Sequence, residues 1–514
     1  MKQVLYLFAA FVLACSLNAQ QLDFDALNQT AKDHLINLIE IDTSQPEPEE
    51  IKAIRYIYKV LNKYKIDWDI YRIEKPRGNL IAVLKADKEL ADPQNKPLLL
   101  IAHLDTAAIQ EGWTLPPAKA TLKDGRIYGL GSTDAKNYAA INLTILTRLA
   151  KGDIKLKRDI IFLFTADEES GSEKGIKYLY DQHGDKLQAA YALNEGGGIM
   201  KGDDAKMPSD ILFIEAGTKM YMDILLSAKG DGGNSSAVGQ NNAIYKLSQA
   251  LSIIESYQPL YKFSPLTRIF FERIFPFQDA DAQTTLKLLE SDDPAQSQQA
   301  AKIISEDEFF KTQITDTITP TILSSGTEAN TVQNEASANL NCRLLPQSDP
   351  MLFVDELSAL FANDENVTLT VIERPETPFP QPPTDLNDQL FKAIEKAARQ
   401  TFGKILVLPG LTPASSESEF LRRHGVITYG IGPLIQKNGN GPHEPDESIT
   451  EKDLFDQLKL TFNIVMNLVT DTPDLPEEEP AVAQEGETQS QEGQTPQDEF
   501  LPVIENEVLP QTAE

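Results

Sequence analysis

Short apolar runs recur along the first half of the chain, and helical patterns separate them. Runs at 97–102, 160–166 and 189–193 are nearly continuous in aliphatic and aromatic residues and have the length of strands. Such runs are typical of strands covered on both faces, as in parallel sheets. Helices are expected at Asp23–Ile41, at Glu49–Tyr64 and after Asp134. The alternation predicts an α/β fold with a mostly parallel, helix-covered sheet.

The pattern changes near Thr218 and returns after residue 373. Extended runs and two helices between these points predict a small two-layer α+β unit, with a long helical insert at Tyr257–Phe310. Because strand-helix alternation resumes afterwards, the second domain must be inserted into the first. We therefore expect a first domain in two parts, 20–217 and 374–470, interrupted by an inserted domain at 218–373.

The N-terminus predicts export. Lys2, the apolar stretch Val4–Ala14 and the small residues that follow are typical of a secretory signal at 1–19, which would give a periplasmic or secreted protein. Leu13-Ala14-Cys15 also resembles a bacterial lipoprotein processing site, so anchoring through Cys15 is the alternative. The apolar stretch is too short to span a bilayer, and no transmembrane span is expected after signal removal.

The C-terminal stretch 471–514 predicts a disordered acidic tail. It contains 13 acidic residues and no Lys or Arg, with almost no apolar periodicity. The whole chain has a formal net charge of −30 and lacks any basic stripe. This charge distribution excludes nucleic acid as a partner.

Residues that can bind metal ions follow the predicted strands. They are His103, Asp134, Glu169, Glu195 and His443. Asp134 alone could cap the helix that follows it, but a hydrolytic two-metal site needs this mixture of imidazoles and carboxylates with one bridging carboxylate. We expect Asp134 to be the bridge, with His103 and Glu195 on one metal and Glu169 and His443 on the other. Donors without thiolate favour two zinc ions, with cobalt or manganese as alternatives.

Two further acidic residues are expected to act beside the ligands. Glu168 is next to a ligand without being needed as one, so it can take a proton from water as general acid/base. Asp105 can accept the imidazole N–H of His103 and fix the ring. The remaining histidines lie in polar contexts that indicate surface residues: His34, His183 and His424.

These residues lie in stretches that resemble the dizinc metallopeptidases that include aminoacylase, carboxypeptidase S and the glutamate carboxypeptidases (metallopeptidase family twenty). The matching stretches are Leu100–Asp105, Asp124–Lys136, Thr165–Gly171, Asn194–Gly197 and Gly441–Glu447. The resemblance implies a zinc-exopeptidase-like domain with an inserted ferredoxin-like lid, and hydrolysis of an amide bond beside a free carboxylate. It also implies a cis peptide after Asp134.

The sequence departs from this family at residues that handle the substrate. Asn234 stands where the family's lid has a histidine, and its amide could donate to an oxyanion or merely shape a turn. Arg343 matches a lid arginine that pairs with a substrate carboxylate, unless it is a strand surface residue. Asn330 matches an asparagine near the substrate. Glu419 stands where relatives often have arginine, which reverses the charge.

The resemblance implies a carboxypeptidase-like enzyme that acts on small peptides or N-acyl amino acids. One alternative is an aminopeptidase or dipeptidase of the same family, in which Glu417 or Glu419 contacts a free amine. Another is a non-catalytic binding protein that retains the metals. Relatives dimerise through the lid, so a homodimer is also expected unless the insert at 257–310 covers that surface.

Overall fold

The computed structural model describes residues 22–201, 210–237, 239, 241–289, 291, 293–372, 386–414, 416–433 and 440–471. The predicted signal segment, Cys15 and nearly all of the predicted acidic tail lie outside these residues. All the described residues lie in the first of the chain's two units, Met1–Asp471, which is compact. The boundaries expected inside it at 217 and 373 stay predictions.

A large twisted sheet carries the predicted buried runs at its centre. Its strand order is β1 (Trp68–Tyr71), β2 (Asn79–Leu84), β6 (Ile160–Thr165), β3 (Leu98–His103), β7 (Tyr191–Asn194), β17 (Ile427–Gly430), β9 (Ile211–Thr218) and β16 (Leu406–Thr412), with β8 (Gly198–Met200) paired to β9. The central strands β6, β3, β7 and β17 are parallel, whereas β2 and β9 run antiparallel to them. The carboxyl ends of the central strands therefore lie at one edge of the sheet.

Helices cover both faces of this sheet, as the continuous apolar runs predict. In β3, Leu98, Leu100 and Ala102 pack on one face, and Leu99 and Ile101 pack on the other. The first face is covered by α2 (Phe24–Ile39), α3 (Glu50–Tyr64), α4 (Lys136–Leu149), α12 (Gln389–Phe402) and α14 (Glu451–Val469). The second is covered by α5 (Ile176–His183) and α13 (Ser418–Arg423).

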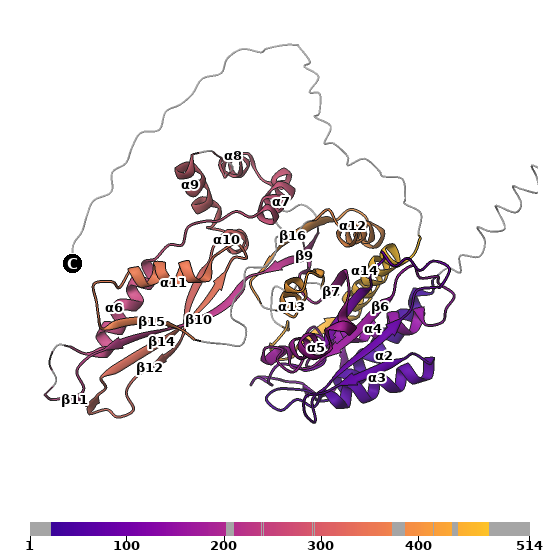
Figure 1. The fold of residues 1–514 in the computed structure, drawn as a ribbon, viewed down its shortest axis with the longest axis horizontal. Coiled ribbons are helices and arrows are strands. Elements are labelled where there is room, and N and C mark those ends of the chain that lie inside the picture. Colours follow the sequence, from indigo (N-terminus) through magenta and orange to yellow (C-terminus); the bar gives the residue numbers. More distant parts are fainter. Residues whose placement is uncertain are drawn as a thin grey trace, which may run out of the picture. The chain divides into compact units, whose positions relative to one another are not determined.

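A second, antiparallel sheet occupies the segment where the pattern changes. Its order is β12 (Thr317–Ser324), β14 (Glu335–Leu344), β10 (Met220–Lys229) and β15 (Val367–Val371). Side chains of β14 alternate between buried and partly exposed, and the buried ones pack against α6 (Ala243–Ser256) and α11 (Pro350–Ala359). This is the two-layer α+β arrangement that the sequence predicts (Figure 1). A short ladder, β11 (Gly233–Asn234) with β13 (Thr331–Val332), extends from it.

The predicted helical insert forms four helices: α7 (Pro265–Ile274), α8 (Ala280–Leu288), α9 (Pro294–Ile304) and α10 (Glu308–Ile314). Their apolar residues pack with Phe213 of β9 and Leu408 of β16. Among the described residues, we find no helix with both the length and the apolar character needed to cross a bilayer.

A small sheet that was not predicted brings the C-terminal segment to the N-terminal one. It consists of β18 (Ser448–Thr450), β5 (Arg126–Tyr128) and β4 (Thr121–Lys123). Ser448 pairs with Tyr128 and Thr450 with Arg126. The loop that precedes β18 is thereby held beside the loop that follows β5, and these two loops contain His443 and Asp134.

Candidate metal centre

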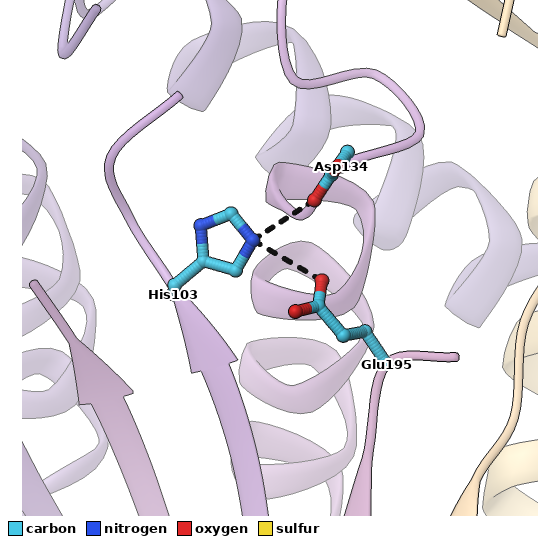
Figure 2. A group of neighbouring side chains, drawn as sticks. All are labelled: His103, Asp134 and Glu195. Carbon is cyan, nitrogen blue, oxygen red and sulfur yellow. Dashed lines mark hydrogen bonds and ion pairs between the residues drawn. The ribbon is translucent and has the colours of Figure 1, made fainter. Parts of the chain in front are cut away.

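One group of ligands lies at the carboxyl ends of the central strands. His103 is the last residue of β3, Glu195 directly follows β7, and Asp134 lies in the loop before α4. The Nε2 atom of His103 lies 2.9 Å from Oδ1 of Asp134 and 3.1 Å from Oε2 of Glu195. Figure 2 shows both carboxylates directed at this nitrogen. The three side chains thus converge on one point, as expected for one metal.

A second group shares Asp134 with the first. Nε2 of His443 lies 3.3 Å from Oδ2 of Asp134 and 3.0 Å from Oε2 of Glu169. Asp134 therefore directs one carboxylate oxygen toward each histidine. The peptide bond Asp134-Ala135 is cis, as the resemblance implies. The side chain of His443 is 53% exposed whereas that of His103 is 1% exposed, so the two groups differ in their access to solvent.

The charges in this centre suit cations. Hydrogen bonds to Asp134 and Glu169 raise the pKa of His443 to about 11, and burial opposes the rise. Burial alone would lower the pKa of His103, but Glu195, Asp105 and Asp134 raise it well above its ordinary value. Burial and the charge of Asp134 raise the pKa of Glu195 to about 7. The carboxylates that stabilise the protonated rings of His103 and His443 would also stabilise divalent cations.

The donor atoms of both groups are of the kinds, and at the spacing, that two metal ions need. In each, the three candidate donor atoms lie within 4.8 Å of one another. The donors are imidazole nitrogens and carboxylate oxygens without thiolate, which suit zinc and related divalent ions. The arrangement can therefore hold two cations joined by one carboxylate.

Glu168 lies beside this centre without belonging to either group. It begins the 3₁₀ turn η1 (Glu168–Ser170) that follows β6. Burial, and then the charges of Glu195 and Asp134, raise its pKa well above the ordinary value, and His103 opposes this. A carboxyl group with a raised pKa beside a metal centre can both accept and return a proton near neutral pH.

Asp105 accepts the N–H of His103, as predicted, but through its backbone carbonyl. The backbone carbonyl of Asp105, and not its carboxylate, accepts the hydrogen bond from Nδ1 of His103, at 2.9 Å. Oδ1 of Asp105 lies 3.6 Å from Nδ1, which is too long for a hydrogen bond. The carboxylate instead accepts the backbone N–H groups of Glu168 and Glu169, each at 3.2 Å. Because Nδ1 donates to a carbonyl, Nε2 of His103 is left for a metal.

The predicted substrate residues of the second sheet do not join these groups. Oδ1 of Asn234 accepts from the backbone N–H and the hydroxyl of Ser236, at 3.1 and 3.0 Å, so this oxygen shapes a turn. Asn234 pairs with Thr331 in the β11–β13 ladder, and the carbonyl of Asn330, just before β13, accepts the N–H of Ser235 at 3.0 Å. The guanidinium of Arg343 lies 4.4 Å from the ring centroid of Tyr221, on the partly exposed face of β14.

Glu419 and Glu417 lie close in sequence but differ in their contacts. Glu419 is buried in α13 and pairs with Arg423 of the same helix at 3.3 Å. Glu417 is fully buried and accepts a hydrogen bond from the hydroxyl of Thr165 at 2.8 Å. Burial raises the pKa of Glu417 to about 8, and the charges that act on it include those of His103 and Glu195. Sequence reasoning considered Glu417 only as an amine contact and missed this buried position beside the centre.

Comparisons with known proteins agree with this geometry. Residues 99–467 match the family described as Peptidase family M20/M25/M40. The mouse N-fatty-acyl-amino acid synthase/hydrolase PM20D1 is 27% identical over 402 residues, which cover 74% of this chain and 76% of that protein.

Two solved structures share the fold. The M20 family metallo-carboxypeptidase Sso-CP2 from Sulfolobus solfataricus has a TM-score of 0.61 at 18% identity, with 85% of this chain and 99% of that one covered. YXEP of Bacillus subtilis, described as a dinuclear metal binding peptidase from the M20 family, has a TM-score of 0.54 at 13% identity, with 86% of this chain and 99% of that one covered. On the match over residues 99–467, with the two ligand groups that share Asp134, this chain belongs to peptidase family M20/M25/M40 and is a metallopeptidase or amidohydrolase of that family.

Proposed function

We propose that this protein is a dizinc exopeptidase that hydrolyses an amide bond beside a free carboxylate, in a short peptide or an N-acyl amino acid. The single observation that carries the proposal is the position of Asp134 between two histidine–carboxylate pairs, with Glu168 beside them. The metal ligands are His103, Asp134 and Glu195 for one zinc ion and Asp134, Glu169 and His443 for the other. Cobalt or manganese could replace zinc with the same donors.

When bound, two such cations lower the pKa of water towards about 7 and polarise a carbonyl group. Glu168 takes the proton from the attacking water and later delivers it to the leaving amine, as a general base and then a general acid. Asp105 supports this step because its carboxylate holds the backbone of Glu168 and Glu169.

The names of similar proteins support this substrate class. One is named an N-fatty-acyl-amino acid synthase/hydrolase and another a metallo-carboxypeptidase, and the compounds in both names carry a free carboxylate next to the amide. Arg343, with Asn234 and Asn330, is proposed to contact that carboxylate or the oxyanion, since a guanidinium suits a carboxylate. The alternative within the family is an aminopeptidase or dipeptidase, in which Glu417 or Glu419 contacts the amine.

Export and assembly are part of the proposal. The apolar stretch Val4–Ala14 supports removal of 1–19 and a periplasmic or secreted protein, with a lipid anchor at Cys15 as the alternative. A homodimer is proposed on the resemblance alone.

Replacing Glu168 with Gln tests the reaction. The amide keeps the size of the side chain but cannot carry the proton, so kcat should fall about 10²- to 10⁴-fold while two metal ions per chain are retained. The assay uses peptides with free or blocked termini and N-acyl amino acids, and metal content is measured by elemental analysis. Glu173→Gln in the same loop is the matched control and should keep wild-type kcat. Metal-loaded wild-type protein that binds these compounds without cleaving any of them would instead identify a binding protein.

A further inference from the structure

The loop that carries Glu168 has an unfavourable backbone conformation. Asp167, the residue before Glu168, has a φ of 72°, in the left-handed region that residues other than glycine seldom adopt. Gly171 and Ser172, at the end of the same loop, also have positive φ values. Such a conformation persists only where the surrounding contacts hold it.

Arg77 provides such a contact. Its Nη2 atom donates to Oδ1 of Asp167 at 2.9 Å, while Oδ2 of Asp167 accepts the backbone N–H of Lys174 at 2.9 Å. Arg77 is 7% exposed and Asp167 is 4% exposed, so this ion pair is shielded from solvent. Both carboxylate oxygens of Asp167 are therefore committed to the conformation of the loop.

Arg77 is itself held in place by Glu50. The Nε atom of Arg77 lies 2.8 and 2.7 Å from the two carboxylate oxygens of Glu50, and Nη2 lies 2.6 Å from one of them. Glu50 is the first residue of α3 and is fully buried. The planar guanidinium can contact both carboxylates at once because its donors form a rigid fork.

Asn79 secures the two ends of the same loop. Its Oδ1 accepts the N–H of Ala166 at 2.9 Å, and its Nδ2 donates to the carbonyl of Lys174 at 2.8 Å. Asn79 thus ties the ends of the loop, and Asp105 holds the backbone of Glu168 and Glu169. Arg77 adds a contact to the side chain of Asp167, which lies between these points.

We infer that Arg77 is a positioning residue for the reaction. Through its contact with Asp167 it sets the direction of the Glu168 carboxylate, and Glu50 holds Arg77 in place. The inference rests on the proposed role of Glu168 as the base. A misplacement of about 1 Å in a reacting group can cost about 10²-fold in rate. Arg77 should therefore affect kcat although it touches neither the metals nor the substrate.

The experiment compares four single variants and the double variant of R77M with D167N. Arg77→Met removes the charge and the fork, Arg77→Lys keeps the charge but lacks the fork, and Asp167→Asn weakens the same contact from the other side. Arg158→Met is the matched control, because Arg158 is also buried, at 3% exposed, but donates to the carbonyl of Lys96 and to Gln389.

We expect kcat to fall about 10- to 100-fold in R77M, with KM and the content of two metal ions unchanged. R77K should recover part of the loss in kcat. R77M combined with D167N should be no slower than R77M alone, because both changes break the contact between Arg77 and Asp167. A loss of kcat in R158M as large as that in R77M would show a general effect of buried arginines and would overturn the inference.

Hydrogen exchange gives a readout that does not depend on turnover. Amides of residues 166–175 should exchange faster in R77M and D167N than in the wild type, while amides of β7 and α14 keep their protection. Unchanged protection at 166–175 would overturn the inference even if activity is lost. If the wild-type protein cleaves no substrate but the loop exchanges faster in R77M, the proposed function is contradicted. The role of Arg77 in holding the loop is then still supported.

Discussion

At the scale of single residues, contacts divide the five histidines of the chain into ligands and structural residues. His103 and His443 each face two carboxylates. His183 packs on Tyr71 and Tyr178, and His424 stacks on Tyr180. The prediction that His34 lies on the surface is wrong: it is buried and its Nδ1 lies 2.6 Å from the hydroxyl of Tyr56. Its position on the apolar face of α2 was not evident from its polar neighbours in sequence.

His34 predicts a pH dependence of stability. Burial lowers its pKa to about 4, so the folded state favours the neutral ring, whereas the unfolded chain binds the proton at about 6.5. The stabilisation is complete above pH 6.5 and is lost as the pH falls towards 4. Between pH 7.5 and pH 5 the loss due to His34 should be about 2 kcal/mol.

Urea unfolding of wild type and His34→Gln at pH 7.5 and pH 5 measures this contribution. The variant should lose about 2 kcal/mol less than the wild type between the two pH values. His183→Gln, the control, should behave as the wild type. Equal losses in H34Q and wild type would contradict the assignment.

At the scale of elements, the small sheet of β18, β5 and β4 completes the metal centre. Glu447, just before β18, is buried and its carboxylate accepts the N–H groups of Gly131 at 2.9 Å and of Thr133 at 2.7 Å. Burial raises its pKa to about 7, and these hydrogen bonds oppose the rise. Glu447 thus ties the loop of His443 to the loop of Asp134.

Replacing Glu447 with Ala should weaken the metal held by Asp134, Glu169 and His443. Loss of a supporting contact of this kind typically lowers metal affinity about 10- to 100-fold. The metal held by His103, Asp134 and Glu195 should lose less affinity, since it shares Asp134 but its other two ligands, His103 and Glu195, lie at strand ends. Competition with a chromophoric chelator measures the two affinities. Wild-type affinity at both positions would disprove the role of Glu447, and Glu451→Gln, next to β18 but partly exposed, is the control.

Sequence patterns predicted the long elements better than the short ones. The buried centre of the sheet and the helices α2 and α3 agree with the expected ranges to within a few residues, and α4 follows Asp134 as expected. Strand β16 was missed because Pro409 and Gly410 interrupt its apolar pattern, and such residues are tolerated there because β16 is an edge strand. Strands β4, β5 and β18 have three residues each, which is too short for any periodicity to show.

At the scale of the whole molecule, the candidate ligands come from segments far apart in the chain. His103 and Glu195 are 92 residues apart, and Glu169 and His443 are 274 apart. Two bound cations would therefore link strand ends and loops across the first compact unit. Bound metal stabilises the folded state because the unfolded chain does not hold these ligands together.

Zinc should raise the midpoint of thermal unfolding relative to chelator-treated protein. One site at a free metal concentration of about 100 times its Kd adds about 2.7 kcal/mol, which is a shift of about 3 °C for a unit of this size. Differential scanning calorimetry measures the shift. His103→Ala should abolish most of it, because His103 is the buried ligand. Superimposable traces with and without zinc would argue against metal binding.

Residue chemistry and local pattern by themselves determined the parallel sheet, the strand ends that carry His103 and Glu195, and the choice of Asp134 as the shared carboxylate. These follow from short-range signals, because a buried strand needs a continuous apolar run and a metal needs particular donor atoms. Only the tertiary structure decided that the carbonyl of Asp105 faces His103, that Glu417 is buried beside the centre, and that Arg77 holds Asp167. Those contacts depend on how loops from different elements meet, and no local pattern encodes that meeting.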